Sequence, residues 1–327
     1  MSNLGPLRFK PYFKPVLWGG NRIASFKGIP PHNEPVGESW EISGLEGFIS
    51  IVSEGQYAGQ DIETLLENHG DDILGRKIHR IYGSKFPLLI KFIDASKDLS
   101  IQVHPDDTLA RERHGCWGKT ELWYTLEPEP GAYIYSGLQS SITPEQLQKH
   151  IEDNTFSDVL AKFTPRRGDL FYLPAGRIHS IGAGNLILEI QQTSDITYRV
   201  YDYNRTDLNG HKRELHIDLA LDAIDFRVHE DYMRHIEPLT NREIVLKECP
   251  FFTATLINID SRFRLQVARY NSFRIIIATR GHGAICDSFG NETTIRQGET
   301  LLIPANTHWV DITPHSDDME IVTAYIQ

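Results

Sequence analysis

The sequence contains only three cysteines, Cys116, Cys249 and Cys286, among its 327 residues. Three scattered cysteines cannot form the several pairs of a disulfide-stabilised secreted domain. Long apolar runs are missing as well, because no stretch approaches the roughly 20 residues that a membrane-spanning helix needs. The first residues lack the charged and apolar segments of a secretory signal. We therefore expect a cytoplasmic protein that does not bind membranes.

The sequence has fewer positively charged than negatively charged residues. The chain has 33 Lys and Arg residues against 44 Asp and Glu residues, which gives a net charge of −11. This balance argues against a nucleic acid or an anionic membrane as partner. A phosphorylated substrate would need a local cationic pocket to offset the general repulsion. With 40% hydrophobic and 24% charged residues, the composition is that of a soluble globular protein.

Short strands separated by turns dominate the pattern. Three segments have helical periodicity instead, at about residues 61–80, 143–163 and 217–224. The second opens with Thr143, Pro144 and Gln146, the residues of a capping box with proline in the first turn. Strands with few helices predict a mainly β protein built as a sandwich or barrel. The strand-rich parts are residues 1–60, 86–94, 168–203 and 246–327.

The chain contains an internal repeat. Residues 168–179 read glycine, acidic residue, four-residue apolar strand, Pro-Ala turn and histidine, and residues 298–308 follow the same order with one residue fewer. A polar stretch without periodicity, residues 225–243, lies between the two copies. A duplicated fold explains the repeat. We therefore predict two domains, residues 1–228 and 246–327.

Alternating polar residues predict a metal site. Gln102 and His104 would share one face of a strand, and Lys119 and Glu121 would share one face of a later strand. If the two strands are neighbours, these four side chains converge, and His179 from the repeat adds a second imidazole. Two histidines, one carboxylate and one amide oxygen suit a divalent ion such as zinc. Alternatively, the Gln102 amide orients a neighbouring group or a bound water.

Cationic residues accompany this candidate site. Lys91 lies in the middle of an apolar strand, where it either serves function or extends past the core to water. Arg199 lies on a later strand, and Arg205 would share its face if that strand continues. An ion pair between Arg199 and Glu189 is the structural alternative for that arginine.

Five longer stretches are distinctive, and together they resemble a known family. They are Leu17–Gly20 (LWGG), Gly37–Glu41 (GESWE), Leu99–Asp107 (LSIQVHPDD), Gly118–Tyr124 (GKTELWY) and Ile196–Arg205 (ITYRVYDYNR). The set resembles the type I mannose-6-phosphate isomerases, in order, over roughly residues 1–215. The repeat at residues 168–179 resembles the second conserved motif of the cupin barrels.

The resemblance implies two cupin-like (jelly-roll) β-barrels with short helical insertions. It also implies a zinc-dependent aldose–ketose isomerase that interconverts mannose 6-phosphate and fructose 6-phosphate through an enediol. One zinc ion per chain would be held by Gln102, His104, Glu121 and His179, with Arg199 as the active-site arginine. The second barrel keeps His308, but Gly281-His282-Gly283 stands where a His-x-His pair is expected, so we predict no metal there.

The isomerisation needs a base near C1 and C2 and cations for the developing charge and the phosphate. Lys119 and Glu189 are both candidates for the base, and the sequence does not choose between them. The candidate phosphate-binding residues are Ser100, Lys91 and Arg205.

Two other functions fit parts of the pattern. Two histidines and a carboxylate in a β-barrel also suit a non-haem iron oxygenase, and a cupin scaffold can serve as a non-catalytic sugar-binding protein. The isomerase is favoured because an oxygenase needs no phosphate pocket and a binding protein needs no base. The sequence makes no prediction of the oligomeric state.

Overall fold

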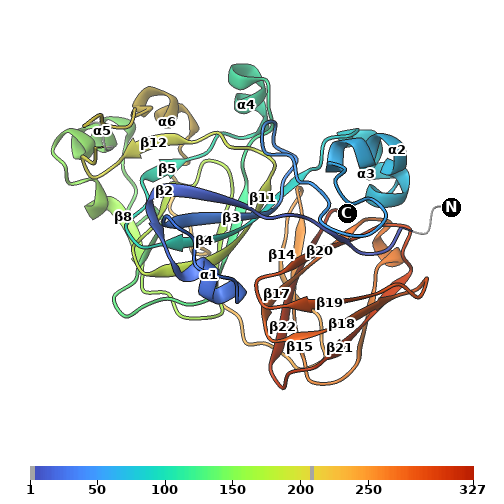
Figure 1. Ribbon diagram of the computed structural model, residues 1–327. Coiled ribbons are helices and arrows are strands. Elements are labelled where there is room, and N and C mark those ends of the chain that lie inside the picture. Colours follow the sequence, from blue (N-terminus) through green and yellow to red (C-terminus); the bar gives the residue numbers. More distant parts are fainter. Residues whose placement is uncertain (1–3, 207–209) are drawn as a thin grey trace.

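The computed structural model of the protein describes residues 4–206 and 210–327 (Figure 1). The described chain is mainly β, as predicted, and its strands form four sheets, none of which closes on itself. The strands from Tyr12 to His235, which we call the N-terminal half, form two of the sheets. The strands from Ile244 to Tyr325, which we call the C-terminal half, form most of the other two.

The N-terminal half forms a five-stranded and a seven-stranded sheet. The five-stranded sheet has the order β12 (Tyr198–Tyr201), β5 (Ile101–Val103), β10 (His179–Ile181), β7 (Ile134–Leu138) and β8 (Leu160–Phe163). The seven-stranded sheet has the order β13 (Arg234–His235), β9 (Asp169–Leu173), β6 (Glu121–Thr125), β11 (Asn185–Gln192), β4 (Leu88–Ala95), β2 (Tyr12–Gly20) and β3 (Val36–Ile42).

The C-terminal half forms a six-stranded and a four-stranded sheet. The six-stranded sheet has the order β1 (Leu7–Arg8), β20 (Thr300–Ile303), β17 (Arg274–Arg280), β22 (Met319–Tyr325), β15 (Thr253–Ile259) and β14 (Ile244–Glu248). The four-stranded sheet has the order β16 (Phe263–Gln266), β21 (Trp309–Pro314), β18 (His282–Asp287) and β19 (Glu292–Arg296). The first strand of the chain thus completes a sheet of the last strands.

Helices are short and lie outside the sheets (Figure 1). They are α1 (Arg22–Lys27), α2 (Ile62–Leu74), α3 (Arg76–Tyr82), α4 (Asp107–His114), α5 (Pro144–Glu152) and α6 (Ile217–Ala223), with 3₁₀ turns η1 (Phe156–Val159) and η2 (Ala268–Tyr270). All three helical segments predicted from the sequence are present, the third as α6. Of the helices in the described residues, none combines the length and the apolar character needed to cross a membrane.

The capping signals act as the sequence indicates. Asp61 accepts a hydrogen bond from the Thr64 N–H at the start of α2, and Thr143 and Gln146 form the reciprocal capping box of α5. Helix α4 was not predicted, because it has a single buried residue, Ala110, and therefore no apolar periodicity.

One hydrophobic cluster joins the two halves. It includes Phe92 and Leu188 from the seven-stranded sheet, Phe273 and Val322 from the C-terminal half, and Leu66 of α2, all of them fully buried. Because these side chains exclude water together, the two halves stabilise each other.

The internal repeat has the same local geometry in both copies. Gly168 and Gly298 have φ angles of 88° and 79°, the left-handed region that favours glycine. The carbonyls of Pro174 and Pro304 each accept a hydrogen bond from the N–H three residues later, at 3.0 and 3.1 Å. Each copy is thus a glycine turn, a strand and a proline turn that leads into a histidine.

Candidate metal centre and active site

The register of the five-stranded sheet aligns three of the predicted site residues. Gln102 on β5 is the cross-strand partner of His179 on β10 and of Arg199 on β12. Cross-strand partners project from the same face of a sheet, so Arg199, Gln102 and His179 form a row. His104 lies just after β5 and has the same parity as Gln102.

The seven-stranded sheet supplies the carboxylates. Glu121 is the first residue of β6, and Glu189 on β11 pairs with Trp123 on one side and Lys91 on the other. The strands of His104 and Glu121 are not neighbours, because β5 and β6 belong to different sheets. The side chains meet instead across the interior between the two sheets.

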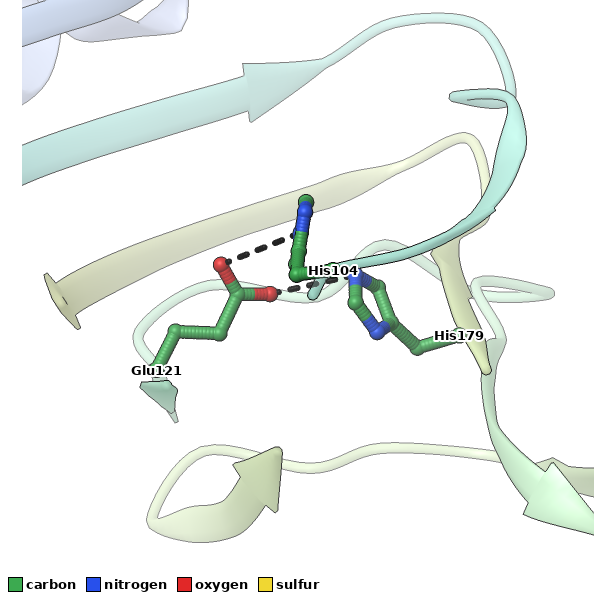
Figure 2. Close-up of side chains that lie close together, drawn as sticks. All are labelled: His104, Glu121 and His179. Atoms are coloured by element: carbon green, nitrogen blue, oxygen red, sulfur yellow. Dashed lines mark ion pairs between the residues drawn. The ribbon is translucent and has the colours of Figure 1, made fainter. Parts of the chain in front are cut away.

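Three of the predicted metal ligands converge at this point (Figure 2). His179 Nε2 lies 3.1 Å from Glu121 Oε1, and His104 Nε2 lies 3.6 Å from Glu121 Oε2. The candidate ligand atoms all lie within 4.8 Å of one another, and the three residues are at most 1% exposed. In the described part of the chain, this is the one group of three or more histidine, cysteine or carboxylate residues with such spacing.

Both imidazoles are oriented by main-chain carbonyls. His104 Nδ1 lies 2.8 Å from Ile196 O, and His179 Nδ1 lies 2.8 Å from Arg177 O. Because a carbonyl only accepts, each Nδ1 carries a hydrogen and each Nε2 presents its lone pair to Glu121. Burial lowers the pKa of His104 well below its ordinary value and that of His179 to about 3, so both rings are neutral.

The convergence of these acceptors fits a cation. Two imidazole lone pairs face a buried carboxylate, and neither Glu121 oxygen accepts a well-formed hydrogen bond within the described chain. The Lys119 ammonium is the positive group that the structure offers, with Nζ 2.8 Å from Glu121 Oε2 and 3.1 Å from His104 Nε2. Neutral nitrogen and carboxylate oxygen donors of this kind suit a divalent metal ion.

Gln102, the fourth predicted ligand, lies at the edge of this group. Its Nε2 is 3.4 Å from His179 Nε2, and its Oε1 accepts a hydrogen bond from Ser100 Oγ at 3.2 Å. A half-turn of the amide would direct Oε1 into the site. Ligation by Gln102 remains a prediction.

Metal binding should release a proton below pH 7. Burial raises the pKa of Glu121 to about 7, against the opposing effect of Lys119. A metal needs the ionised carboxylate, so at pH 6 binding displaces about one proton, and at pH 8.5 almost none. Calorimetry in two buffers of different ionisation enthalpy counts the protons at each pH. An equal count at pH 6 and pH 8.5 would contradict this assignment.

Glu189 and Lys91 form a buried ion pair beside the triad. Lys91 Nζ lies 3.2 Å from Glu189 Oε1 and 3.5 Å from Glu38 Oε2, above the Trp40 ring. Burial alone would lower the pKa of Lys91, but the two carboxylates outweigh it and raise that pKa. The partner of Glu189 is therefore Lys91, not Arg199, and Trp123 Nε1 donates to its other oxygen at 3.0 Å.

The two predicted arginines lie on β12 and beyond its end. Arg199 Nη1 donates to Glu214 O at 2.8 Å, and burial lowers the pKa of Arg199. Strand β12 ends at Tyr201, so Arg205 lies beyond it rather than on the same strand face. Arg205 donates to the Asp98 carbonyl and forms an ion pair with Asp202.

The sequence analysis did not identify several residues that neighbour the site. Glu38 was missed although it lies in the GESWE stretch, because nothing in its spacing identifies Lys91 as its partner. Asp202 and Arg213 were also missed. In the C-terminal half, His308 and His282 are exposed and belong to no three-ligand group among the described residues. The absence of metal there remains a prediction.

Known proteins resemble this chain along most of its length. A family model described as the catalytic domain of type I phosphomannose isomerase matches residues 7–133. The mannose-6-phosphate isomerase ManA of Bacillus subtilis is 35% identical over 304 residues, which cover 91% of this chain and 93% of that protein. A mannose-6-phosphate isomerase of Streptococcus mutans is 34% identical over 321 residues, 98% of each protein.

Solved structures agree with this similarity. The crystal structure of a mannose 6-phosphate isomerase from Bacillus subtilis superposes with a TM-score of 0.85 at 30% identity, and the match covers 99% of this chain and 100% of that chain. A putative mannosephosphate isomerase from Archaeoglobus fulgidus has the same fold, with a TM-score of 0.80 at 21% identity over 99% of this chain and 98% of that chain.

Proposed function

The chain belongs to the type I phosphomannose isomerase family, and on that premise we propose that it interconverts mannose 6-phosphate and fructose 6-phosphate with the help of one bound zinc ion. The observation that supports a bound metal ion is the buried carboxylate of Glu121, which faces two imidazole lone pairs. In this proposal His104, Glu121 and His179 hold the ion, and Gln102 is the fourth ligand.

When bound there, zinc supplies Lewis acidity to the oxygens on C1 and C2 of the sugar. The chain itself must move a proton between these carbons through an enediol. Lys119 and Glu189 remain the two candidates for the base. Lys119 contacts both His104 and Glu121. Glu189 is kept ionised, because Lys91 and Lys119 lower its pKa against the effect of burial.

Arg199 is the cation for the charge that develops during enolisation. It lies beside Gln102 in register, and its guanidinium is anchored on the Glu214 carbonyl. A fixed cation costs little reorganisation when charge develops, which is why it favours the transition state over the ground state.

Ser100, Lys91 and Arg205 are the proposed phosphate-binding residues. Arg205 contacts the segment that leads into β5, because it donates to the carbonyl of Asp98, two residues before Ser100. Lys91 is as buried as Ser100, and its ammonium already has two carboxylate partners, Glu38 and Glu189.

Lys91→Ala separates a binding role from a structural role. If Lys91 reaches the phosphate, we expect a higher KM for mannose 6-phosphate and a weaker preference for the phosphorylated sugar. The variant should also lose about 3–5 kcal/mol of unfolding free energy, because Glu38 and Glu189 are left without their buried partner. Steady-state kinetics and urea unfolding give the two readouts.

The matched control is Lys85→Ala, which removes an exposed lysine paired with Glu63 at 3.2 Å. Surface pairs contribute little, so neither readout should change appreciably. An unchanged phosphate preference in Lys91→Ala would assign Lys91 to structure alone.

We also propose two cupin-like barrels, residues 1–228 and 246–327, with the second free of metal. Two short strands pair across these bounds, since β1 pairs with β20 and β13 with β9. The matching turns at Pro174 and Pro304 support a duplication. The substrate is a small sugar phosphate met in the cytoplasm, without a nucleic acid or membrane partner.

A coupled assay on mannose 6-phosphate, run under nitrogen and in air on protein of known metal content, tests the function. We expect equal isomerase rates in both atmospheres and zinc near one equivalent per chain. An oxygenase would require air, and a binding protein would leave the sugar unchanged.

A further inference from the structure

Two guanidinium groups pair with one carboxylate beyond the end of β12, and a third lies close enough to feel their charges. Asp202 accepts hydrogen bonds from Arg205 and from Arg213, whose Nε lies 2.8 Å from Asp202 Oδ2. Arg199 joins this group through the residue after Arg213, since its Nη1 donates to the carbonyl of Glu214. We call Arg199, Arg205 and Arg213, together with Asp202, the arginine cluster.

The arginine cluster has more positive than negative charge. Guanidinium groups stay protonated in proteins, and Asp202 is the single carboxylate paired with them in the described chain. Two further carboxylates lie nearby. Asp98 Oδ1 accepts from the Ala183 N–H at 2.8 Å, and the Glu214 side chain is 85% exposed, so that water screens its charge. In a chain with a net charge of −11, this local excess is the kind of pocket that a phosphorylated substrate needs.

The guanidinium groups are held in place, but some of their N–H donors have no hydrogen-bond partner in the described chain. Arg213 Nε and Nη2 donate to Asp202, while Arg213 Nη1 makes no hydrogen bond to the described residues. Arg199 Nε is buried and has no hydrogen-bond partner in the described chain. The side chains of Arg205 and Arg213 are 21% and 30% exposed, so a ligand can reach them. Free donors on anchored arginines are suited to an oxyanion.

A tight turn brings Arg205 back onto Asp202. The Arg205 N–H donates to Asp202 O at 3.0 Å, and the two residues between them, Tyr203 and Asn204, have φ angles of 54° and 53°. Positive φ at both central positions is the pattern of a type I′ turn, which is unfavourable for tyrosine. The surrounding contacts hold this conformation, and strain of this kind is concentrated at functional sites.

We propose that Arg213 is a specificity-determining residue that binds the phosphate group of the substrate together with Arg205, and that Asp202 is the positioning residue that holds both arginines. This inference rests on the proposed function, because it adds a residue to the phosphate side of that same site. A phosphate monoester carries a charge of about −1.5 to −2 at neutral pH. It would therefore be attracted to Arg205 and Arg213, whose two positive charges are only partly offset by Asp202.

The test compares Arg213→Gln with the neighbouring Lys212→Gln in the zinc-loaded enzyme. Lys212 Nζ contacts Asn204 Oδ1 at 3.0 Å outside the arginine cluster, so this control removes the same charge from the next residue. We expect Arg213→Gln to weaken binding of inorganic phosphate and raise the KM for mannose 6-phosphate by about 10- to 100-fold. Its kcat should stay within about threefold, because the contact is the same in ground and transition states.

Asp202→Ala should raise the same KM, since it removes both oxygens that hold Arg205 and Arg213 in place. Arg213→Lys keeps the positive charge but loses the paired N–H donors of the guanidinium, so it should give an intermediate KM. This variant replaces Arg213→Gln in the test if Arg213→Gln does not fold. The proposal would be overturned if Arg213→Gln and Lys212→Gln bound phosphate equally well, or if Arg213→Lys bound phosphate like the unmodified protein. It would also be overturned if Arg213→Gln raised the KM for free mannose as much as the KM for mannose 6-phosphate. Calorimetry with inorganic phosphate requires no turnover, so this inference and the isomerase function can fail separately.

Discussion

His179→Ala should give a folded protein that neither retains zinc nor isomerises mannose 6-phosphate. The substitution removes one of two imidazoles that face Glu121, and the remaining donors no longer surround an ion. Loss of a Lewis acid forfeits several kcal/mol of transition-state stabilisation, so we expect a drop in kcat/KM of about a thousandfold or more. Zinc content by mass spectrometry and the coupled assay give the two readouts.

His308→Ala is the matched control, because His308 holds the equivalent position in the second copy of the repeat and is exposed. Its zinc content and activity should equal those of the unmodified protein. Retention of stoichiometric zinc by His179→Ala, or loss of zinc in His308→Ala, would place the metal elsewhere in the chain.

Arg199→Ala should lose about a hundredfold in kcat, with a smaller change in the KM for mannose 6-phosphate. The guanidinium is fixed by the Glu214 carbonyl, and its buried Nε has no partner among the described residues. Such a donor is of most use where charge develops, and an interaction made only in the transition state lowers kcat rather than raising KM. Steady-state kinetics over a full substrate range separates the two constants.

Arg227→Ala provides the control for the loss of an arginine. Arg227 forms its ion pair with Asp225 on the surface, with 80% of its side chain exposed. Its kinetics should match those of the unmodified enzyme. If Arg199→Ala raises KM and leaves kcat unchanged, Arg199 binds the substrate uniformly and has no special role in the chemical step.

Local sequence patterns predicted much of the fold and the central residues of the site. Strand alternation identified the shared faces of Gln102 with His104 and of Lys119 with Glu121, because that alternation depends on adjacent residues only. The capping box at Thr143 is equally local, and it predicts the start of α5 correctly. These signals need no knowledge of which strands pair.

Features that depend on distant pairing were the ones that the sequence did not reveal. Lys91 has carboxylate partners from β3 and β11, two strands that are far from β4 in sequence. The pairing of β1 with β20 brings together the two ends of the chain. No local period encodes such contacts, because they follow from strand order and register across the whole chain.

The arginine cluster shows the same limit at shorter range. Asp202 and Arg213 are separated by a segment without strand or helix periodicity, so their contact has no signature in the sequence. It arises where the turn at Tyr203 and Asn204 reverses the chain.

Titration of zinc into metal-free protein, with isomerase activity measured at each addition, tests the central claim most directly. We expect no conversion of mannose 6-phosphate without metal, and activity that rises linearly and levels off at one zinc per chain. Full activity in the metal-free protein, or activity that continues to rise well beyond one equivalent, would contradict a single zinc centre at His104, Glu121 and His179.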